Sequence, residues 1–419
     1  MTVSAIGARS GAISWRHLEW WGAAMGLFLQ SGAVFALLLA GPDGEIADAD
    51  RAKLRLLSLP VYAVSLALLA RHPGPLIAAG TRNITLLALL ALPVVSTLWS
   101  VAPVETLRRA IGLILSMALA YLLAIRFSPR QLLLLFGGLL GTLMVLSLAA
   151  LATMPSLAMS PGSEMELRGV FIHKNVLGWA ACLSLLLAAA MARDITRPIR
   201  RLGLALILPS ALCLLLSQSA TSLLAAFVGL AVMGALGLMA RTNGMGRAII
   251  VFILVQLAAS LLLVLAYSLG PLLEALGKDA TLTGRVPLWA EVDRAIAEHP
   301  VLGYGYQAFW SEGNLRVWTI RDTIGWAAPH AHNGYREMML GLGIVGVVLC
   351  LILIVRALVQ TAAHHCRAPT AGWLWMCPLV SAALVINLSE SNLLIQNDLM
   401  TIVLGTIMVA AAYRRTHHE

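Results

Sequence analysis

The chain has 419 residues and a formal net charge of +9, and 59% of its residues are hydrophobic whereas only 12% are charged. Soluble domains have about 25% charged residues, so this composition excludes a string of two or three soluble domains. The mean hydropathy of +0.85 indicates a polytopic membrane protein. Because the basic residues fall in short gaps between apolar blocks, we attribute the positive charge to loop topology and not to nucleic acid binding. Four of the five cysteines lie in apolar blocks, which argues against a disulfide scaffold.

The apolar blocks predict an all-α polytopic membrane protein. A helix needs about 20 mostly apolar residues to cross the hydrocarbon core, where its backbone groups must be satisfied internally. We predict about 12 transmembrane helices, and the first is predicted to be a retained span and not a signal peptide, since no small-residue cleavage site follows it. Their approximate limits are 18–41, 54–70, 83–101, 107–125, 131–154, 175–192, 202–217, 221–240, 248–270, 334–355, 371–388 and 394–412.

Arginine and lysine in the gaps predict that both termini are cytoplasmic. This topology leaves 13 of the 29 basic residues outside, more than the positive-inside rule expects, which indicates that something outside requires cations. Most of them lie in two outer segments, 155–174 and 271–333. The chain is accordingly divided into helices 1–9 over residues 1–270, one long periplasmic loop over 271–333, and helices 10–12 over 334–419.

The long outer loop is predicted to be ordered. Within Val286–Glu298, the side chains of Trp289, Val292 and Ile296 share one helical stripe. Such a pattern is expected of a short amphipathic helix that lies on the membrane surface.

The densest polar group lies at 329–337, where the long loop enters the tenth predicted helix, and it includes His330 and Asn333. A helix that starts here would direct unpaired N–H groups outward, which favours a bound anion such as phosphate. His332 and Arg336 are four residues apart and share a face. With an ordinary pKa near ~6.5, His332 can accept a proton at neutral pH. The plainer interpretation is an interfacial histidine that caps a helix.

Cations from the two outer segments are candidates for contacts with the same anion. Arg168 and Lys174 flank the start of the sixth predicted helix, and Arg285 precedes the predicted surface helix. Arginine favours such positions because its planar fork binds phosphate oxygens through two parallel hydrogen bonds. Arg316 and Arg321 in the long loop are further candidates. The alternative is that these side chains hold lipid headgroups.

Other polar and small residues have simpler interpretations. Gly341, Gly343 and Gly346 permit close helix packing in the tenth predicted helix. Glu390 and Asp398 are conceivable acids or bases for which the sequence indicates no partner. We predict no cofactor, because the sequence has no HExxH, GxxxxGK[ST] or GxGxxG motif and no paired carboxylates near the basic loops. A leaving diphosphate would then be neutralised by arginine and lysine.

The residues around His332 resemble the signature of the bacterial O-antigen ligases, H[NSQ]x9GxxGTxW. His332-Asn333, nine further residues, Gly343 and Gly346 match its first half, whereas Val347 and Leu349 replace the Thr and the Trp. The supporting matches are Arg168-Gly169 with Asn175 and Leu177-Gly178, Thr283-Gly284-Arg285 with Trp289, and His299-Pro300 with Leu302-Gly303, Gly305 and Phe309.

The resemblance implies a GT-C-like architecture and a metal-independent, inverting transfer at the periplasmic face of the bacterial inner membrane. The donor would be O-antigen polysaccharide on undecaprenyl pyrophosphate, and the acceptor a sugar hydroxyl of lipid A core. A motif histidine and two loop arginines are essential in such enzymes, and they correspond to His332, Arg168 and Arg285. We predict that the remaining candidates contact the substrate, and these are Lys174, Arg316, Arg321, Asn333, His330 and Arg336.

Two other functions remain open. An O-antigen polymerase would use the same donor with a second lipid-linked glycan as acceptor, and the departures at Val347 and Leu349 weaken the choice of ligase over polymerase. A lipid-linked glycan flippase or other transporter would place ionisable residues near the bilayer midplane and show repeated halves. The charges instead gather at the outer rim, which favours an enzyme.

Overall fold

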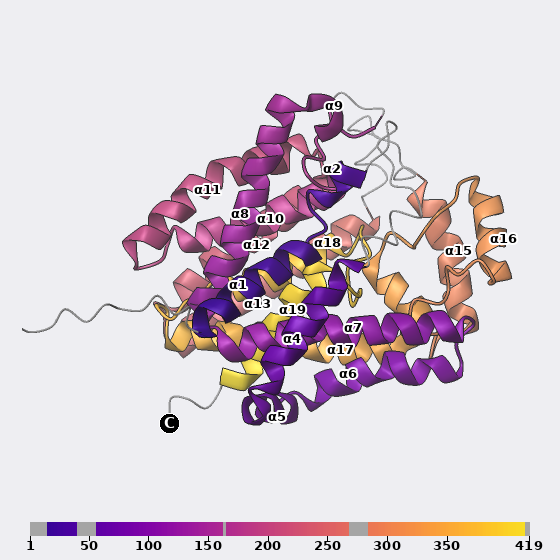
Figure 1. Cartoon of the computed structure of the whole chain (residues 1–419), viewed down its shortest axis with the longest axis horizontal. Coiled ribbons are helices and arrows are strands. Elements are labelled where there is room, and N and C mark those ends of the chain that lie inside the picture. Colours follow the sequence, from indigo (N-terminus) through magenta and orange to yellow (C-terminus); the bar gives the residue numbers. More distant parts are fainter. Residues whose placement is uncertain (1–14, 40–55, 162–164, 268–283, 415–419) are drawn as a thin grey trace, which may run out of the picture.

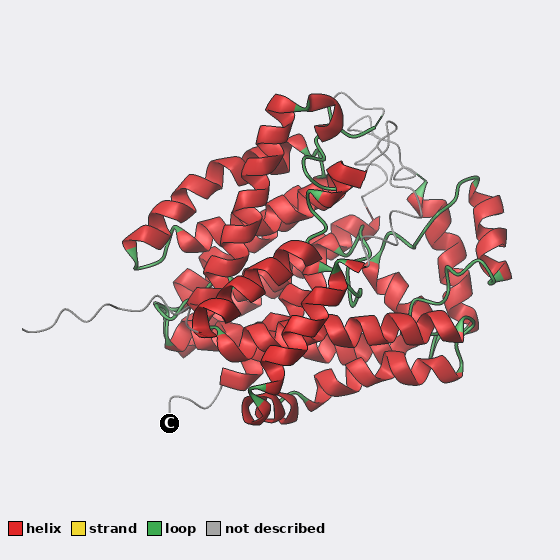
Figure 2. Cartoon of the chain, viewed as in Figure 1, coloured by secondary structure: helices red, strands yellow, loops and turns green. Residues whose placement is uncertain are grey.

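The computed structural model describes residues 15–39, 56–161, 165–267 and 284–414, and helices dominate all four ranges (Figure 1). The described residues form no strand beyond one isolated bridge between Met159 and Leu167, and Figure 2 shows helices joined by short loops. The predicted all-α class is therefore confirmed. The helices are α1 Trp15–Gln30, α2 Phe35–Leu39, α4 Ser58–Ala70, α5 Pro73–Thr81, α6 Ile84–Val95, η1 Ser96–Leu98, α7 Pro103–Arg126, α8 Pro129–Thr153, α9 Pro155–Ala158, α10 Lys174–Met191, α11 Arg197–Leu216, α12 Ala220–Met239, α13 Gly244–Tyr267, α15 Arg285–Glu298, α16 Leu315–Ile324, α17 Gly334–Arg367, α18 Met376–Ile386 and α19 Leu399–Tyr413.

The described helices make the chain a multi-pass membrane protein. Six of them, α7, α8, α10, α11, α12 and α17, are long and apolar enough to cross a membrane, and α4 with α5 is a seventh if the bent pair counts as one span. Shorter apolar helices occur at Ile84–Leu98, Gly244–Leu257, α18 and α19. The number twelve therefore stays a prediction, as does the GT-C-like architecture.

The chain turns sharply just after the span predicted at 54–70. Helix α4 ends at Ala70, and α5 begins at Pro73 after a turn of 98°. A proline fits the first turn of a helix because the ring sets φ and the missing N–H would have no partner there. Arg71, His72 and Pro73 interrupt the apolar residues here, so the sequence marks the end of the helix but not the angle of the turn.

Helix α10 lies at the centre of the bundle, between α8, α11, α12 and α18. About 78% of its apolar window is buried inside the protein, compared with 33% for α11 and for α12. The close packing depends on small residues. At Gly203 of α11, for example, a Cβ atom would collide with the backbone of α10 at Ala192. The exposed apolar faces of α11 and α12 are the surfaces that fit lipid.

The polar residues assigned to the two membrane sides lie at opposite ends of α7. Arg126 at its last turn donates to Glu19, which also bonds His72 at 3.0 Å. Arg109 near its first turn donates to the carbonyl of Gln307. At 1.5 Å per residue these two arginines are about 25 Å apart along the helix. The residues predicted to be cytoplasmic therefore gather at one end, and the long loop lies at the other.

The described part of the long loop folds onto the end of the bundle, and α15 and α16 lie beside the ends of α6 and α7 in Figure 1. The apolar stripe of α15 consists of Leu288, Val292 and Ala295, which are buried against Tyr304, Phe309 and residues of α16 and α17. Trp289 and Ile296 pack at the edge of this cluster. Because protein covers the stripe, α15 does not present it to a membrane surface as we expected. Residues 271–283, including Thr283 of the matched motif, lie outside the described residues.

Helix α17 is broken at Gly343, and the loop is bonded into the break. Gly343 has φ 61° and ψ −163°, a combination that is essentially restricted to glycine. The carbonyl of Leu340 accepts from the N–H of Tyr304 at 2.7 Å, and the N–H of Ile344 donates to the carbonyl of Pro300 at 2.9 Å. In an unbroken helix these two groups of α17 would bond each other. The loop therefore replaces one helical hydrogen bond with two of its own.

We expect Gly343→Ala to destabilise the protein, because an added Cβ would overlap the carbonyl of Val301 and alanine disfavours this backbone conformation. The cost should be at least about 1–3 kcal/mol, visible as a lower thermal unfolding midpoint of the purified protein in detergent. Gly234→Ala in α12 is the matched control, since nothing lies within 4 Å of a Cβ placed there. Equal midpoints for the two variants would contradict the role assigned to the break.

Candidate functional site

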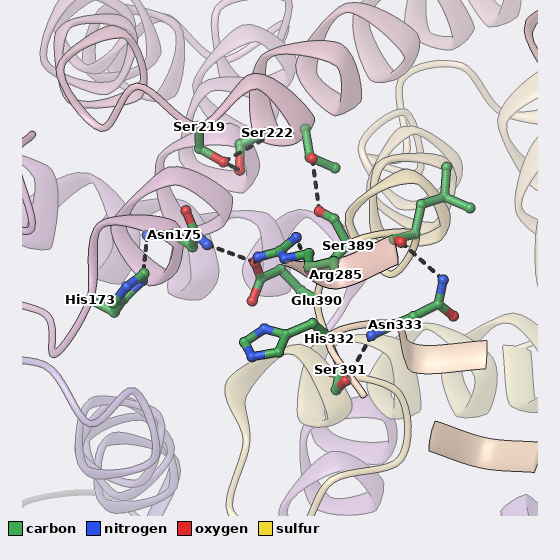
Figure 3. Close-up of polar contacts among 12 residues, drawn as sticks. His173, Asn175, Ser219, Ser222, Arg285, His332, Asn333, Ser389, Glu390 and Ser391 are labelled. Atoms are coloured by element: carbon green, nitrogen blue, oxygen red, sulfur yellow. Dashed lines mark hydrogen bonds and ion pairs between the residues drawn. The ribbon is translucent and has the colours of Figure 1, made fainter. Parts of the chain in front are cut away.

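Residues from four separate segments form one polar cluster at the loop end of the bundle, and Figure 3 shows His332, Arg285, Glu390 and Asn175 converging there. The segments are the turn before α10, the first residue of α15, the turn before α17 and the loop between α18 and α19. We call the set Arg168, His173, Asn175, Arg285, His330, His332 and Glu390 the polar cluster.

His332 immediately precedes the N-cap of α17 and has a left-handed backbone conformation, with φ 48°. Its ring lies 4.0 Å from that of His330 and 5.8 Å from that of Trp326, between centroids. Within the described structure, its Nδ1 atom is buried and has no hydrogen-bond partner. Such an unsatisfied atom is unusual in native proteins and indicates a place where water or a ligand completes the site.

Burial lowers the pKa of His332 to about 3, and the charges of His330, Arg285 and His173 add to this effect. Burial likewise lowers the pKa of His330 to about 4, with smaller contributions from Arg285 and His173. Both rings are therefore neutral at pH 7. The same interactions show that His173 and Arg285 are electrostatic neighbours of the two histidines.

Arg285 begins α15 and is held by the loop after α18. One of its Nη atoms donates to the carbonyl of Ser389 at 2.7 Å, and the other lies 3.4 Å from Oε1 of Glu390. The preceding Gly284 has φ 80°, which the turn into α15 requires and which glycine adopts without steric cost. The guanidinium is thus fixed in direction before any ligand arrives.

Glu390 is the partner that the sequence did not indicate. Its Oε1 also accepts from Nδ2 of Asn175 at 2.8 Å, so this carboxylate links the start of α10 to Arg285. Burial raises the pKa of Glu390, and the charge of Arg285 opposes that rise. The sequence indicated no partner because the three residues are separated from one another by more than a hundred positions in the chain. Asp398 instead caps α19 by accepting from the N–H of Thr401.

Arg168 lies deeper than the other members of the cluster. It is only 2% exposed, and its Nε donates to the carbonyl of Leu157 at 3.0 Å. Burial lowers its pKa, and its charge contributes to the lowered pKa of His173. Gly169 with φ 59° leaves no room for a Cβ beside Ser147, so the turn that carries Arg168 packs tightly on α8.

His173 was not among the predicted site residues. It is the N-cap of α10, and its Nδ1 accepts from the N–H of Asn175 at 3.2 Å. Burial is the largest cause of its lowered pKa, followed by the charge of Lys174. The signal in the sequence that could have identified it is its place between Arg168-Gly169 and Asn175 of the matched motif, with two cations at the start of the sixth predicted helix.

Most of the other predicted contacts hold the loop together instead of joining the cluster. Arg336 forms two hydrogen bonds to Asp293, at 2.7 and 2.9 Å, and lies over the ring of Trp289. Asn333 caps α17 and donates to the carbonyl of Leu388. The remaining pairs are Lys174 with Glu166, Arg316 with Glu298, and Arg321 with the carbonyl of Ala328.

An open cavity of about 390 Å³ lies between α15 and α17. Ile296, Tyr335, Met339 and Val347 supply apolar walls, and Asn333 is among its polar lining. The cavity therefore borders the residue that follows His332. Among the described residues, His, Cys, Asp and Glu do not form a group of three that could hold a metal ion.

Fold and site together define a multi-pass α-helical membrane protein with a basic, histidine-containing cluster at one end of its bundle. Residues 202–351 match the protein family described as O-antigen ligase, so the chain carries an O-antigen ligase family domain. The match includes Arg285 and His332, and it leaves Arg168 and Glu390 outside.

The chain is also similar to the exopolysaccharide production protein ExoQ of Rhizobium meliloti (strain 1021). The two are 35% identical over 201 residues, which is 45% of this chain and 45% of the relative. The similarity thus spans less than half the length of that curated protein.

Stability should fall on acidification because His330 and His332 are half-buried and neutral. The folded pKa values of His330 and His332, about 4 and about 3, lie below the unfolded value near ~6.5. The unfolded chain therefore binds more protons below pH ~6.5, and stability present above that pH is lost as the pH falls toward 4. Between pH 7.5 and pH 5, each of the two histidines should lower the free energy of unfolding by about 2 kcal/mol.

The measurement is the thermal unfolding midpoint at pH 7.5 and at pH 5, for the wild type and for His332→Asn. The unfolding midpoint of His332→Asn should fall less on acidification than that of the wild type. His299→Gln, at an exposed histidine, serves as control and should behave as the wild type does. An identical pH dependence for all three proteins would show that His332 is not buried in its neutral form.

Proposed function

We propose that the protein transfers a glycan from a polyprenyl diphosphate lipid to a sugar hydroxyl at the periplasmic face of the bacterial inner membrane. The observation that carries this proposal is the convergence of a neutral histidine, His332, with the oriented guanidinium of Arg285 at one end of the bundle. The family match over 202–351 supports the same class of reaction. In the finer form of the proposal, undecaprenyl-linked O-antigen is the donor and lipid A core is the acceptor.

Arg285 is suited to bind the diphosphate. Its fork is already directed by Ser389, and within the described ranges Glu390 is the one carboxylate that pairs with it. A diphosphate has a larger negative charge and would replace the carboxylate as the partner of Arg285. Arg168 supplies a second positive charge nearby. Both arginines lie close enough to His173 for their charges to lower its pKa. As the glycosyl bond breaks, negative charge grows on the leaving diphosphate, and these cations stabilise it.

His332 would act as the general base. The acceptor oxygen attacks the anomeric carbon and gives its proton to the imidazole, the bond from that carbon to the diphosphate oxygen breaks, and the configuration inverts. Arg285 is one cause of the low pKa of His332. A bound diphosphate would offset that charge, so the imidazole becomes a stronger base when the donor is in place.

A lipid-linked donor fits the surface beside the site. The cavity between α15 and α17 has apolar walls. Farther along α17, Ile344, Val348 and Leu351 are about half exposed, as expected of a helix face in contact with lipid tails. The polar cluster is thus reached from an apolar surface.

Polymerisation is the second candidate, with another lipid-linked glycan as the acceptor. Two observations favour it: Val347 and Leu349 stand where the ligase signature has Thr and Trp, and the relative is named for exopolysaccharide production. The lipopolysaccharide ladder of a deletion strain separates the two. Loss of every O-antigen band indicates a ligase, whereas a core that keeps one repeat indicates a polymerase.

His332→Asn should abolish transfer while donor binding is retained. Asparagine tolerates the left-handed backbone, so the fold is kept and only the base is lost, which should lower kcat by about 10²–10⁴-fold. The assay is transfer from purified undecaprenyl-linked glycan to lipid A core, with a chelator present. Full transfer by the variant would exclude the base, and no transfer by the wild type to any glycan acceptor would exclude the proposed function.

Arg285→Lys tests the arginine fork separately from its charge. Lysine cannot keep both the Ser389 and the Glu390 contacts, so we expect a loss of about 10²–10³-fold in kcat, the cost of one electrostatic donor. Arg294→Lys is the control, because Arg294 is 71% exposed and pairs with Glu291 on its own helix, away from the polar cluster. Unchanged turnover in Arg285→Lys would argue against a clamp that uses both nitrogens.

A further inference from the structure

The backbone at His332 is held in a conformation that it would not adopt by itself. A residue other than glycine in the left-handed region costs about 1–3 kcal/mol and persists only where its surroundings impose it. With φ 48°, His332 is such a residue. The contacts that impose this conformation also determine where its imidazole points.

Both peptide units that flank the Cα atom of His332 are fixed by side chains. In the first unit, the carbonyl of Ala331 accepts from Nε1 of Trp289 at 2.9 Å, and the N–H of His332 donates to Nδ1 of His330 at 3.1 Å. In the second, the N–H of Asn333 donates to Oγ of Ser391 at 3.1 Å. Fixing the two peptide planes sets both φ and ψ, and therefore the direction of the His332 side chain.

The bond from His332 N–H to His330 defines the state of the second histidine. Because Nδ1 accepts, the neutral ring must have its proton on Nε2. A side-chain acceptor bonded to the N–H two residues later is the geometry of an Asx turn, which asparagine commonly forms. Asn333 makes the same bond to Tyr335, and His173 makes it to Asn175. His330 therefore occupies a position that asparagine could fill.

We propose that His330 is a positioning residue for the transfer reaction, which holds His332 in its left-handed conformation through Nδ1 while Trp289 holds the other end of the same peptide. This inference rests on the proposed function and assigns to His330 a role other than the substrate contact expected from the sequence. It acts through the backbone and does not touch the reacting atoms.

Three substitutions at His330 separate the two roles. In His330→Asn, Oδ1 takes the place of Nδ1 and keeps the bond to His332, whereas in His330→Gln the acceptor moves to the place of Nε2, and His330→Ala has none. We expect His330→Asn to keep kcat within about threefold of the wild type. His330→Gln and His330→Ala should lower kcat by about tenfold to a hundredfold, as a displaced catalytic group does, with the KM for the donor nearly unchanged.

The opposite pattern would overturn the proposal. If His330→Gln is more active than His330→Asn, or if the donor KM rises while kcat stays constant, His330 contacts substrate through Nε2. Trp289→Phe should lower kcat as His330→Ala does, because it removes the bond that holds the other end of the same peptide. Trp318→Phe is its control, because this exposed indole in α16 donates to the carbonyl of Glu312 and lies outside the polar cluster.

A readout that needs no activity distinguishes this inference from the proposed function. In protein labelled with ¹⁵N-histidine, the backbone amide signal of His332 reports the hydrogen bond that its N–H donates to residue 330. All three variants remove the ring of His330, which lies 4.0 Å from that of His332, so the variants are compared with one another. The signal in His330→Asn should stay closer to the wild-type position than the signals in His330→Gln and His330→Ala. If the wild type transfers no glycan but this pattern holds, the proposed function fails and the positioning role stands. If the signal moves equally far in all three variants, the positioning role fails.

Discussion

The exchange of one hydrogen bond in α17 is the constraint on which the rest of the site depends. Gly343 opens the helix, so the carbonyl of Leu340 and the N–H of Ile344 bond to Tyr304 and Pro300 instead of to each other. In a low-dielectric environment such groups must find partners, and only a closely approaching backbone can supply both. The long loop is therefore bound to the helix that begins beside His332.

That anchorage also brings the loop to the bundle. The N–H of Val101 donates to the carbonyl of Tyr304, and Oγ of Ser96 accepts from the N–H of Tyr306. The loop thus lies between α17 and the turn from α6 to α7. Tyr304 is part of the hydrophobic cluster that α15 and α16 form. Its anchorage therefore positions α15, whose first residue, Arg285, lies in the polar cluster.

The sequence predicted those features that local pattern determines. Apolar block length identified the helices, and the motif at His332-Asn333 marked a helix start that the structure places at Gly334. The break at Gly343 and the contact of Glu390 with Arg285 depend on partners far away in the chain, which spacing does not indicate. Charge alone also could not show that Arg316 and Arg336 are paired with Glu298 and Asp293.

The charge balance of the polar cluster explains why neutral histidines suit the proposed reaction. With the three histidines neutral, Arg168 and Arg285 are opposed by Glu390, which leaves a single positive charge if the carboxylate is ionised. A diphosphate diester with two negative charges would make the occupied site negative by one. As the acceptor oxygen gives its proton to His332, the leaving diphosphate gains a further negative charge. The positive charge of the imidazolium balances that new charge, so the net charge of the site stays at minus one. In a buried site, where unbalanced charge is costly, this coupling favours proton transfer only when the donor is bound.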